Sequence, residues 1–404
     1  MRALRGRRVL LGVTGGIACY KALFVARDLT LAGAEVDVVL TASALEFVGR
    51  ITFEALTGRP THTALLDAGH ALDHIRLARA ADLVLVAPAT ADCLARAAHG
   101  RADDLLSACL LATTAPVLLA PAMNDRMWAH PQTVRNVAHL RELGYRVLDP
   151  DEGPLAVGEG SGPGRLPEPA TIVAHATRLL GEGGPLTGRR VLVTAGPTRE
   201  AVDPVRYVSN HSSGRMGVAV AAAAWARGAD VTLVHGPLSV PLPVGVRAVA
   251  VESTGEMCEA VRAELPSSDA LVMAAAPADF RPASAAATKI KKGEGVPPLA
   301  FEPTPDILLA TRDARRPGAV IVGFALETGD PVPSAREKLR RKALDLVVAN
   351  DATEPGAGFG VATNRVTLVD RTGAAHALPL LGKDEVAEEI LDRVIALLGE
   401  AGGR

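Results

Sequence analysis

The sequence predicts an α/β protein built from two doubly wound domains. A strand–turn–helix–strand pattern opens near Arg8 and again near Arg189. The strands in both patterns are continuously apolar rather than alternating, which is typical of a parallel sheet covered by helices on both faces. The length of 404 residues exceeds what one ordinary hydrophobic core contains. We therefore expect two sheets, each with its own core.

In the first half, a strand RVLLGV leads into the turn Thr14–Gly16, a helical pattern from Ile17 to about Leu31, and a second strand EVDVVL. The runs DLVLVAPAT and APVLLAPAMN predict further buried strands. The segment Asp149–Pro169 contains so many Gly and Pro residues that we expect a long loop, typical of an active-site lid. A short helix over 170–180 should complete this half.

The second half repeats the pattern after the segment GEGGPLTG, which we interpret as an interdomain linker. Its expected strands are RRVLVTAG, DVTLVHG, DALVMAAAPADF, AVIVGFALET and LDLVVAND, with an alanine-rich helix over Gly214–Arg227. A final strand and helix are expected between about Val366 and Leu398. The predicted organisation is a first domain over 1–180, a linker over 181–188 and a second domain over 189–404.

The composition excludes several classes of protein. The net charge of −2 argues against a broad surface for nucleic acid or anionic membrane. No apolar run approaches the roughly 20 residues that cross a bilayer, and the basic N-terminus lacks an apolar signal core. The four cysteines are scattered without a CxxC pair, so neither a zinc site nor a disulfide framework is indicated. We expect a cytoplasmic protein without nucleic-acid or membrane partners.

Common nucleotide signatures are missing. Neither first turn contains GxGxxG, the second strands VVLTASA and TLVHGPL end without an acidic residue, and no Walker A motif is present. These absences disfavour a nicotinamide-dependent dehydrogenase or a P-loop protein. Hydroxyls and glycines at three strand ends, in Thr14–Gly16, Thr41–Ser43 and Thr90, suit a mononucleotide such as FMN. The same residues also suit helix caps and turns, and spacing does not choose between the two.

The second half carries a different set of polar residues. The loop SNHSSGRMG, Ser209–Gly217, precedes the alanine-rich helix, and KIKK, Lys289–Lys292, lies in a Gly/Pro-rich stretch. Lys338 and Lys342 are four residues apart and so share one helical face. Each group separately is typical of a solvated surface. Their combination with an anion-holding loop favours a triphosphate site.

Seven motifs occur in an order that resembles a known family: GVTGGIACYK, APATAD, PAMN, GPTREAVDPVRYVSNHSSGRMG, KIKK, GFALET and AND. The chain closely resembles the bacterial bifunctional phosphopantothenoylcysteine decarboxylase/phosphopantothenate–cysteine ligases of coenzyme A biosynthesis. The resemblance implies a flavodoxin-like, FMN-dependent decarboxylase domain followed by a Rossmann-like, CTP-dependent ligase domain. It also implies that 4′-phosphopantothenate, cysteine and CTP are the substrates, with Mg²⁺ on the triphosphate. An acyl-cytidylate would form first and 4′-phosphopantetheine last.

The resemblance assigns residues in the first half. His74, in LDHIRLARAADL, matches the catalytic histidine, and Asn124, in PAMN, matches the asparagine that holds the substrate carboxylate. The residues that match the flavin shell are Gly15, Gly16, Ile17, Ser43, Thr90 and Met123.

In the second half, Asn210 matches an asparagine linked to the acyl-cytidylate, and Lys289 matches a catalytic lysine at the α-phosphate. The resemblance identifies no protein ligand for the metal. The residues that match the CTP site are Met273, Ala274, Ala275, Asp279, Lys289, Pro305, Asp306, Ile307, Leu308, Phe324, Lys338 and Lys342.

One position departs from the family pattern. Many members carry a cysteine in the flap before GPGR, where it donates a proton as reduced flavin returns its electrons; this chain has Val157 there. Either another acid such as Glu159, or a water, donates the proton; or the reaction stops at the enethiol; or the decarboxylase half is impaired. Two further hypotheses are a ligase fused to a related cysteine decarboxylase, and a non-enzymatic regulatory subunit.

The resemblance also implies a homo-oligomer. Decarboxylases of this kind form trimers with FMN between subunits, and the ligase domains form dimers. Together these contacts imply a dodecamer.

Overall fold

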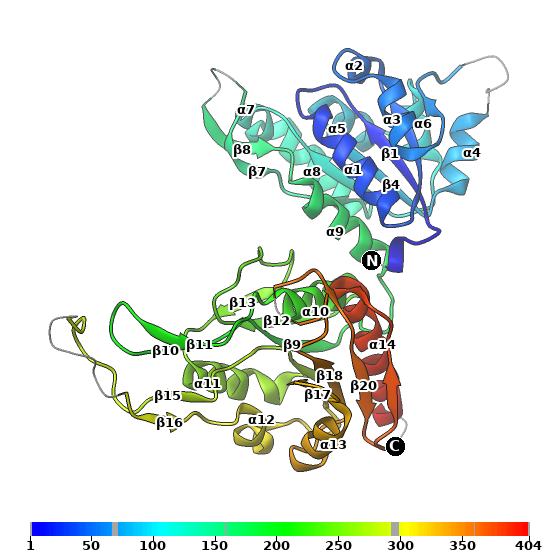
Figure 1. Ribbon diagram of the computed structural model, residues 1–404. Coiled ribbons are helices and arrows are strands. Elements are labelled where there is room, and N and C mark those ends of the chain that lie inside the picture. The colour runs from blue at the N-terminus through cyan, green and yellow to red at the C-terminus, as the bar shows by residue number, and fades with distance from the viewer. Residues whose placement is uncertain are drawn as a thin grey trace. The chain divides into compact units, whose positions relative to one another are not determined.

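The computed structural model describes residues 2–66, 72–156, 158, 160–291, 299–358 and 360–402. Val157 and Glu159 of the predicted flap lie outside the described residues, as does Lys292. The chain forms two compact units, Met1–Glu182 and Gly183–Arg404. Each is an α/β unit with its own sheet (Figure 1). The predicted class, two doubly wound domains, is confirmed.

The N-terminal sheet has six strands in the order β3-β2-β1-β4-β5-β6. All five neighbouring pairs are parallel. The order reverses direction between β1 and β4, so the loops that follow these two strands diverge to opposite faces. The strands are β1 (Arg8–Val13), β2 (Glu35–Leu40), β3 (Thr61–His62), β4 (Leu83–Ala89), β5 (Val117–Pro121) and β6 (Arg146–Val147).

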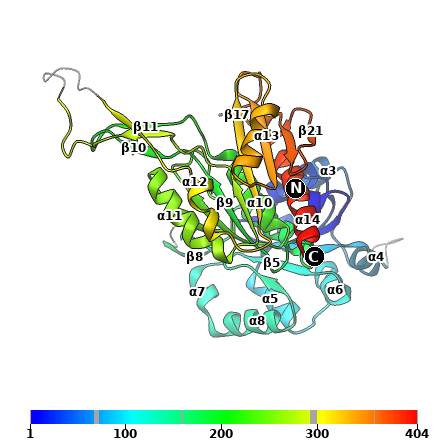
Figure 2. The same cartoon turned by 90° about the horizontal axis from the view of Figure 1, so that it is seen from below.

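Helices cover both faces of this sheet (Figure 1 and Figure 2). Successive residues of β1 point to opposite faces of the sheet: Leu11 packs in one apolar cluster and Leu10 in the other. The first cluster contains α1 (Cys19–Leu31), α3 (Arg50–Thr57) and α9 (Pro169–Leu180). The helices that contribute to the second are α4 (Asp73–Ala80), α5 (Ala91–Ala98), α6 (Leu105–Ala112) and α8 (Pro131–Glu142). The short helices α2 (Ala42–Leu45) and α7 (Asp125–Ala129) follow β2 and β5.

The prediction of a long loop over Asp149–Pro169 is wrong. The segment contains an antiparallel hairpin of β7 (Asp151–Pro154) and β8 (Ser161–Arg165). Gly and Pro have low intrinsic preference for strands, but here the strand forms through its pairing partner. Gly164 also accepts a hydrogen bond from the Met123 N–H at 3.0 Å. Both interactions are distant in sequence, so local composition did not reveal them.

The C-terminal sheet has eight strands in the order β13-β12-β9-β14-β17-β18-β20-β21. Its first six strands are parallel and reverse direction between β9 and β14, as in the N-terminal unit. The last two are antiparallel, so this sheet contains two strands after Val366 where one was predicted. The strands are β9 (Arg190–Ala195), β12 (Asp230–His235), β13 (Arg247–Ala250), β14 (Ala270–Met273), β17 (Val320–Glu327), β18 (Leu346–Asp351), β20 (Thr367–Asp370) and β21 (Ala375–Ala377).

Helices α11 (Thr254–Glu264), α12 (Ile307–Ala310) and α13 (Val332–Arg341) pack in one apolar cluster with the sheet. Helices α10 (Arg215–Ala226) and α14 (Lys383–Gly402) contact each other. Short strand pairs extend from the sheet (Figure 1): β10 (Arg199–Ala201) with β11 (Tyr207–Ser209), and β15 (Phe280–Pro282) with β16 (Phe301–Pro303). A third pair joins β19 (Thr363–Asn364) to β22 (Leu381–Gly382). Among the described residues, no helix has the length and apolar character to cross a membrane.

An ion pair joins the two helices α10 and α14. The Arg227 guanidinium lies 2.9 Å from Glu388 Oε2 through Nε and 2.7 Å from Asp392 Oδ1 through Nη1. The Arg227 and Glu388 side chains are 14% and 8% exposed. Removing one member of a buried pair leaves the other charge desolvated, which is strongly destabilising.

We therefore expect Arg227→Met to lower the free energy of unfolding by about 3 kcal/mol. Urea unfolding followed by circular dichroism measures the change. Arg393→Met is the matched control, because Arg393 is exposed on α14 and forms no ion pair with any described residue. Equal unfolding curves for the two variants would show that the pair does not stabilise the fold.

Candidate functional site

Ligands of open α/β sheets bind beyond the carboxyl ends of the strands, where the strand order reverses. In the N-terminal unit this point lies between Thr14, after β1, and Thr90, after β4. The Thr14 hydroxyl donates to the Pro88 carbonyl at 2.8 Å and accepts from the Thr90 N–H at 3.0 Å. These bonds hold Thr14 and Thr90 side by side where the loops after β1 and β4 separate.

A close approach of two loops explains why glycine occupies position 15. A Cβ added to Gly15 would lie 2.3 Å from Ser43 Cβ and 2.8 Å from the Ser43 carbonyl oxygen, closer than real atoms approach. The neighbouring Gly16 faces open space, and Ile17 is exposed. Backbone N–H groups and hydroxyls around an open surface fit the phosphate of a mononucleotide. The predicted residues Gly15, Ser43 and Thr90 thus belong to adjacent loops.

The PAMN segment lies against the base of the β7–β8 hairpin. Asn124 caps α7 by accepting from the Arg126 N–H at 2.9 Å. A Cβ at Gly164 would lie 2.2 Å from the Met123 carbonyl oxygen, so only glycine permits this contact. Met123 and Asn124 are therefore held by the hairpin on one side and by α7 on the other.

His74 is the second residue of α4. Its Nδ1 is buried and makes no hydrogen bond with any other described residue. The helix start is anchored by Asp73, whose carboxylate lies 3.3 Å from His62 Nδ1 and 3.0 Å from Arg76 Nε. Within the described residues, no hydrogen bond joins His74 to Asn124 or to the threonines. An unsatisfied buried imidazole nitrogen is the kind of group that a ligand pairs with.

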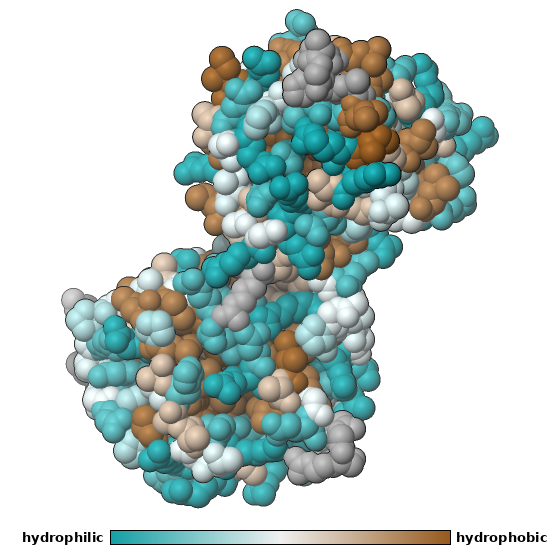
Figure 3. Space-filling view, turned by 90° about the vertical axis from the view of Figure 1, so that its right-hand side faces the viewer, coloured by the Kyte–Doolittle hydropathy of each residue, from teal (hydrophilic) through white to brown (hydrophobic). Residues whose placement is uncertain are grey.

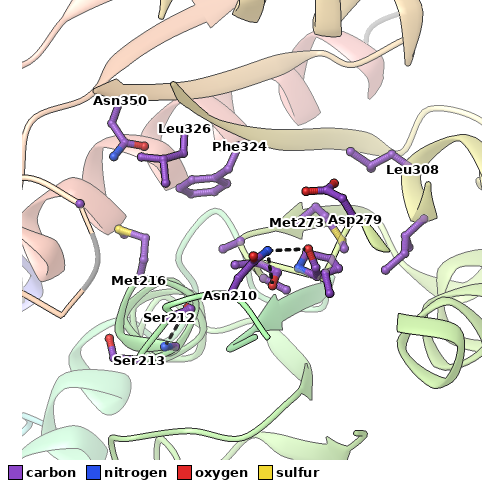
Figure 4. Close-up of a pocket in the computed structure, with 18 of the residues that line it drawn as sticks. Asn210, Ser212, Ser213, Met216, Met273, Asp279, Leu308, Phe324, Leu326 and Asn350 are labelled. Atoms are coloured by element: carbon purple, nitrogen blue, oxygen red, sulfur yellow. Dashed lines mark hydrogen bonds between the residues drawn. The ribbon is translucent and has the colours of Figure 1, made fainter. Parts of the chain in front are cut away.

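The C-terminal unit has a cavity of about 460 Å³ at the corresponding point, between β9 and β14. Figure 4 shows Asn210 near its centre, with Met216 and Asn350 toward one end and Leu308 toward the other. Every residue predicted for the CTP site except Lys289 lines it, and so does Asn210. These residues are Asn210, Met273, Ala274, Ala275, Asp279, Pro305, Asp306, Ile307, Leu308, Phe324, Lys338 and Lys342.

The Asn210 side chain is oriented by two backbone carbonyls. Its Nδ2 donates to Pro277 O at 2.9 Å and to Ala276 O at 3.4 Å (Figure 4). The amide oxygen has no hydrogen-bond partner among the described residues and remains available as an acceptor. The loop then turns into α10 at Gly214, which has φ +75°.

Two predicted lysines, Lys338 on α13 and Lys342 directly after it, also line the cavity. Lys338 Nζ donates to Phe324 O at 2.7 Å, and Lys342 Nζ lies 2.7 Å from Asp306 Oδ2. Burial lowers the pKa of Lys338, and the nearby Lys342 charge lowers it further. This side of the cavity therefore carries two lysine charges, of which the Lys342 charge is paired with Asp306.

Lys289 is exposed and does not line this cavity. Its segment is held on the β10–β11 turn, because the Ala286 N–H donates to Val202 O at 3.0 Å and the Ile290 N–H donates to Asp203 Oδ2 at 3.2 Å. The other predicted CTP contacts meet around the cavity. Lys289 does not, because it follows β15, which lies outside the main sheet.

Sequence reasoning missed several residues that line the cavity. Arg215, Asn350, Asn364 and Lys383 come from four separate elements. Asn350 is the penultimate residue of the buried strand β18, and the carboxyl end of a strand often carries ligand contacts in α/β proteins, so this signal was present. Lys383 has no such signal, because it reaches the cavity through the packing of α14.

Two doubly wound units, one with a hydroxyl-lined strand edge and one with a cationic cavity, define a two-domain α/β enzyme for phosphorylated ligands. Residues 1–181 match the family model Flavoprotein, and residues 186–398 match the DNA/pantothenate metabolism flavoprotein C-terminal domain. The coenzyme A biosynthesis bifunctional protein CoaBC of Vibrio cholerae serotype O1 is 46% identical over 395 residues, covering 97% of this chain and 98% of the relative.

CoaBC of Mycobacterium tuberculosis strain H37Rv is 49% identical over 407 residues, covering 97% of each chain. A crystal structure of the C-terminal domain of a CoaBC protein aligns at 38% identity with a TM-score of 0.45, covering 54% of this chain and 99% of that one. The chain belongs to the CoaBC family of bifunctional coenzyme A biosynthesis proteins. It is an enzyme with phosphopantothenoylcysteine decarboxylase and phosphopantothenate–cysteine ligase activities.

An enethiol product, left unreduced because Val157 replaces a cysteine, has no support from these relatives or from the described residues. The hypotheses of a regulatory subunit and of a dehydrogenase fall with the family assignment.

The turn that anchors the Lys289 segment depends on the ionised Asp203 carboxylate. Burial by itself would raise the pKa of Asp203. Hydrogen bonds from the N–H groups of Val205, Ile290 and Arg206, and from the Arg206 guanidinium, outweigh burial and hold the pKa at about 2. This stabilisation is present above the unfolded pKa of about 4 and is lost as the pH falls toward 2.

Asp203→Asn should therefore be less stable than the parent at pH 7 and should lose less stability between about pH 4 and about pH 2. Thermal unfolding across this range measures the difference. Asp230→Asn is the control, since Asp230 is exposed and forms no ion pair with the described residues. Parallel pH profiles for the parent and Asp203→Asn would contradict the assignment.

Proposed function

We propose that FMN binds the N-terminal unit at the carboxyl edge of its sheet. Gly15, Gly16, Ile17, Ser43, Thr90 and Met123 are its proposed contacts. The fit rests on the Gly15–Ser43 approach, the paired Thr14 and Thr90, and open space at Gly16. When bound, FMN supplies the electron-accepting chemistry that makes loss of carbon dioxide from a cysteine carboxylate feasible.

His74 and Asn124 are the proposed catalytic side chains of this half. The Asn124 amide binds the carboxylate that is lost, and the His74 imidazole holds or moves a proton at that end of the substrate. The unsatisfied Nδ1 of His74 supports this role, because an imidazole nitrogen can either donate or accept near neutral pH.

The cavity in the C-terminal unit is the proposed site of ligation, with CTP between the α13 lysines and the loops that follow β14. A carboxylate oxygen of 4′-phosphopantothenate attacks the α-phosphorus, and pyrophosphate leaves. The cysteine amine then attacks the acyl carbon and gives up a proton to solvent, the amide forms, and CMP leaves with the C–O bond electrons. Lys338 and Lys342 oppose the charge of the phosphates.

The observation that carries this proposal is the gathering of Asn210 with all the predicted CTP contacts but Lys289 around one cavity. Mg²⁺ is proposed to enter with the triphosphate. Among the described residues no group of three His, Cys, Asp or Glu side chains is placed to hold a metal, and phosphate oxygens supply magnesium ligands in nucleotide sites.

Assembly into a homo-oligomer completes the proposal. Exposed apolar side chains occur on α1, at Tyr20, Phe24 and Leu31, and on the extended strand pairs, at Tyr207 and Phe280. Figure 3 shows further hydrophobic residues among polar ones on one face. Apolar surface of this kind is typical of subunit contacts. We assign α1 to trimer contacts and the strand pairs to ligase dimers, which together build a dodecamer.

The Lys289 segment belongs to the same extended strand pairs and does not line the cavity of its own chain. The position of Lys289 relative to a ligase site therefore depends on the proposed dimer. We further propose a domain boundary at 180, a linker over 181–188, and a cytoplasmic location.

The decisive experiment is the product mass obtained anaerobically from 4′-phosphopantothenate, cysteine, CTP and Mg²⁺ with FMN-loaded enzyme. We expect 4′-phosphopantetheine.

His74→Asn should accumulate phosphopantothenoylcysteine, because ligation continues while decarboxylation falls at least about a hundredfold. Lys289→Gln should slow pyrophosphate release by a similar factor and leave decarboxylation of supplied phosphopantothenoylcysteine unchanged. A variant that lost both activities would contradict the division of roles.

Gly15→Val should abolish flavin binding, because any Cβ at this position overlaps the Ser43 backbone. Flavin absorbance after reconstitution and gel filtration measures retention. Gly49→Ala is the control, because an added Cβ there meets only Thr52 Oγ1, at 3.8 Å. Full flavin retention by Gly15→Val would place the cofactor elsewhere.

A further inference from the structure

One end of the ligase cavity contains two cationic side chains that the proposed ligation does not use. Arg215 is the first residue of α10 and Lys383 the first residue of α14, and both line the cavity. Arg215 is exposed, whereas Lys383 is only 5% exposed. The resemblance assigns neither residue a role.

Neither side chain has an acidic partner among the residues that the structure describes. Lys383 Nζ donates to the Gly358 carbonyl at 2.9 Å, and within the described part of the chain neither it nor the Arg215 guanidinium forms an ion pair. Lys342, by contrast, is neutralised by Asp306 at 2.7 Å. A buried ammonium without a counter-ion is unfavourable, so this end of the cavity favours an incoming anion.

The electrostatic setting agrees with this geometry. Burial lowers the pKa of Lys383, and the adjacent Arg215 charge lowers it further. Among the described residues, the charged side chains that line the cavity are four cations, Arg215, Lys338, Lys342 and Lys383, and two acids, Asp279 and Asp306. Asp306 is already paired with Lys342. The positive charges of Arg215 and Lys383 are therefore not balanced by that carboxylate.

Neutral donors surround the same end. The N-cap residue of α10, Gly214, provides no side-chain cap. The Gly214 and Arg215 N–H groups donate to Ser212 Oγ at 3.3 Å and to Ser213 Oγ at 3.4 Å. The next N–H groups of the first turn lack partners within the helix and carry the positive end of its dipole. Figure 4 shows Ser212, Ser213 and Met216 around this helix start, with Asn350 at the same end of the cavity. Hydroxyl, amide and N–H donors beside two cations are the chemistry that binds a phosphate.

We propose that Lys383, together with Arg215, binds a phosphate group of a substrate at the α10–α14 end of the ligase cavity. An ammonium has three N–H donors. One is held by the Gly358 carbonyl, which leaves two for phosphate oxygens. The inference rests on the proposed function, since it requires this cavity to hold the ligase substrates. The phosphate belongs either to the terminal part of CTP or to 4′-phosphopantothenate.

The test is Lys383→Met, which removes the charge and keeps the length of the side chain. Calorimetric titration gives the Kd for CTP and for CMP, and steady-state kinetics give KM for 4′-phosphopantothenate. Loss of a charge-assisted hydrogen bond should weaken the phosphate-bearing ligand about tenfold to a hundredfold. Lys383→Arg should recover part of the loss.

The two sources give different results. Weaker CTP binding with unchanged CMP binding identifies the terminal phosphates of the nucleotide. A raised KM for 4′-phosphopantothenate with unchanged kcat and unchanged CTP binding identifies the other substrate. Equal weakening of all three ligands would mean that Lys383 only holds the segment around Gly358, and would overturn the proposal, as would no change in any of them.

Controls separate this inference from the proposed function. Arg393→Met removes one positive charge from the exposed face of α14 and should leave all three constants unchanged. If Lys383→Met does not fold, Arg215→Met answers the same question, because Arg215 is exposed and makes no side-chain bond to other described residues. Failure of the parent enzyme to bind CTP would instead refute the proposed function.

Discussion

The reversal of strand order in each sheet is the constraint on which the rest of this molecule depends. At that point the loops after two adjacent parallel strands must leave in opposite directions, and strand-end backbone groups remain without sheet partners. In the N-terminal unit Thr14 and Thr90 bond to each other across the gap, and in the C-terminal unit the loops after β9 and β14 open a cavity. Both candidate sites therefore arise from the same topological feature.

The two units then differ in what they place around that feature. The N-terminal edge is small and polar, with Gly15 against Ser43, and it carries no lysine among its predicted contacts. The C-terminal cavity is cationic, because α13 on one side and the starts of α10 and α14 on the other direct lysine and arginine into it. The helices determine the charge around each candidate site, whereas the strand order of the sheet determines where the site lies. A polar strand edge and a cationic cavity are thus two elaborations of one architecture.

The strands and the major helices were predictable because a buried parallel strand requires a continuous apolar run, and this requirement is local. Most residues that line the C-terminal cavity were also predictable, since residues such as Met273 and Phe324 lie in strands of the central sheet. The β7–β8 hairpin was not, because its Gly- and Pro-rich strands are stabilised by each other and by Met123. Lys289 was expected in the cavity, but its segment is held on the β10–β11 turn.

The sequence by itself determined the fold class, the order of the elements and the motifs that identify the family, because these depend on residue patterns within single elements. The tertiary structure decided which charges meet. The Ile290 N–H donates to the Asp203 carboxylate across 87 positions, and the Arg215 charge acts on Lys383 across 168. Such pairs depend on how helices pack on a sheet, and no local pattern specifies that packing. This is why the buried Lys383, separated in sequence from every motif, became visible only in three dimensions.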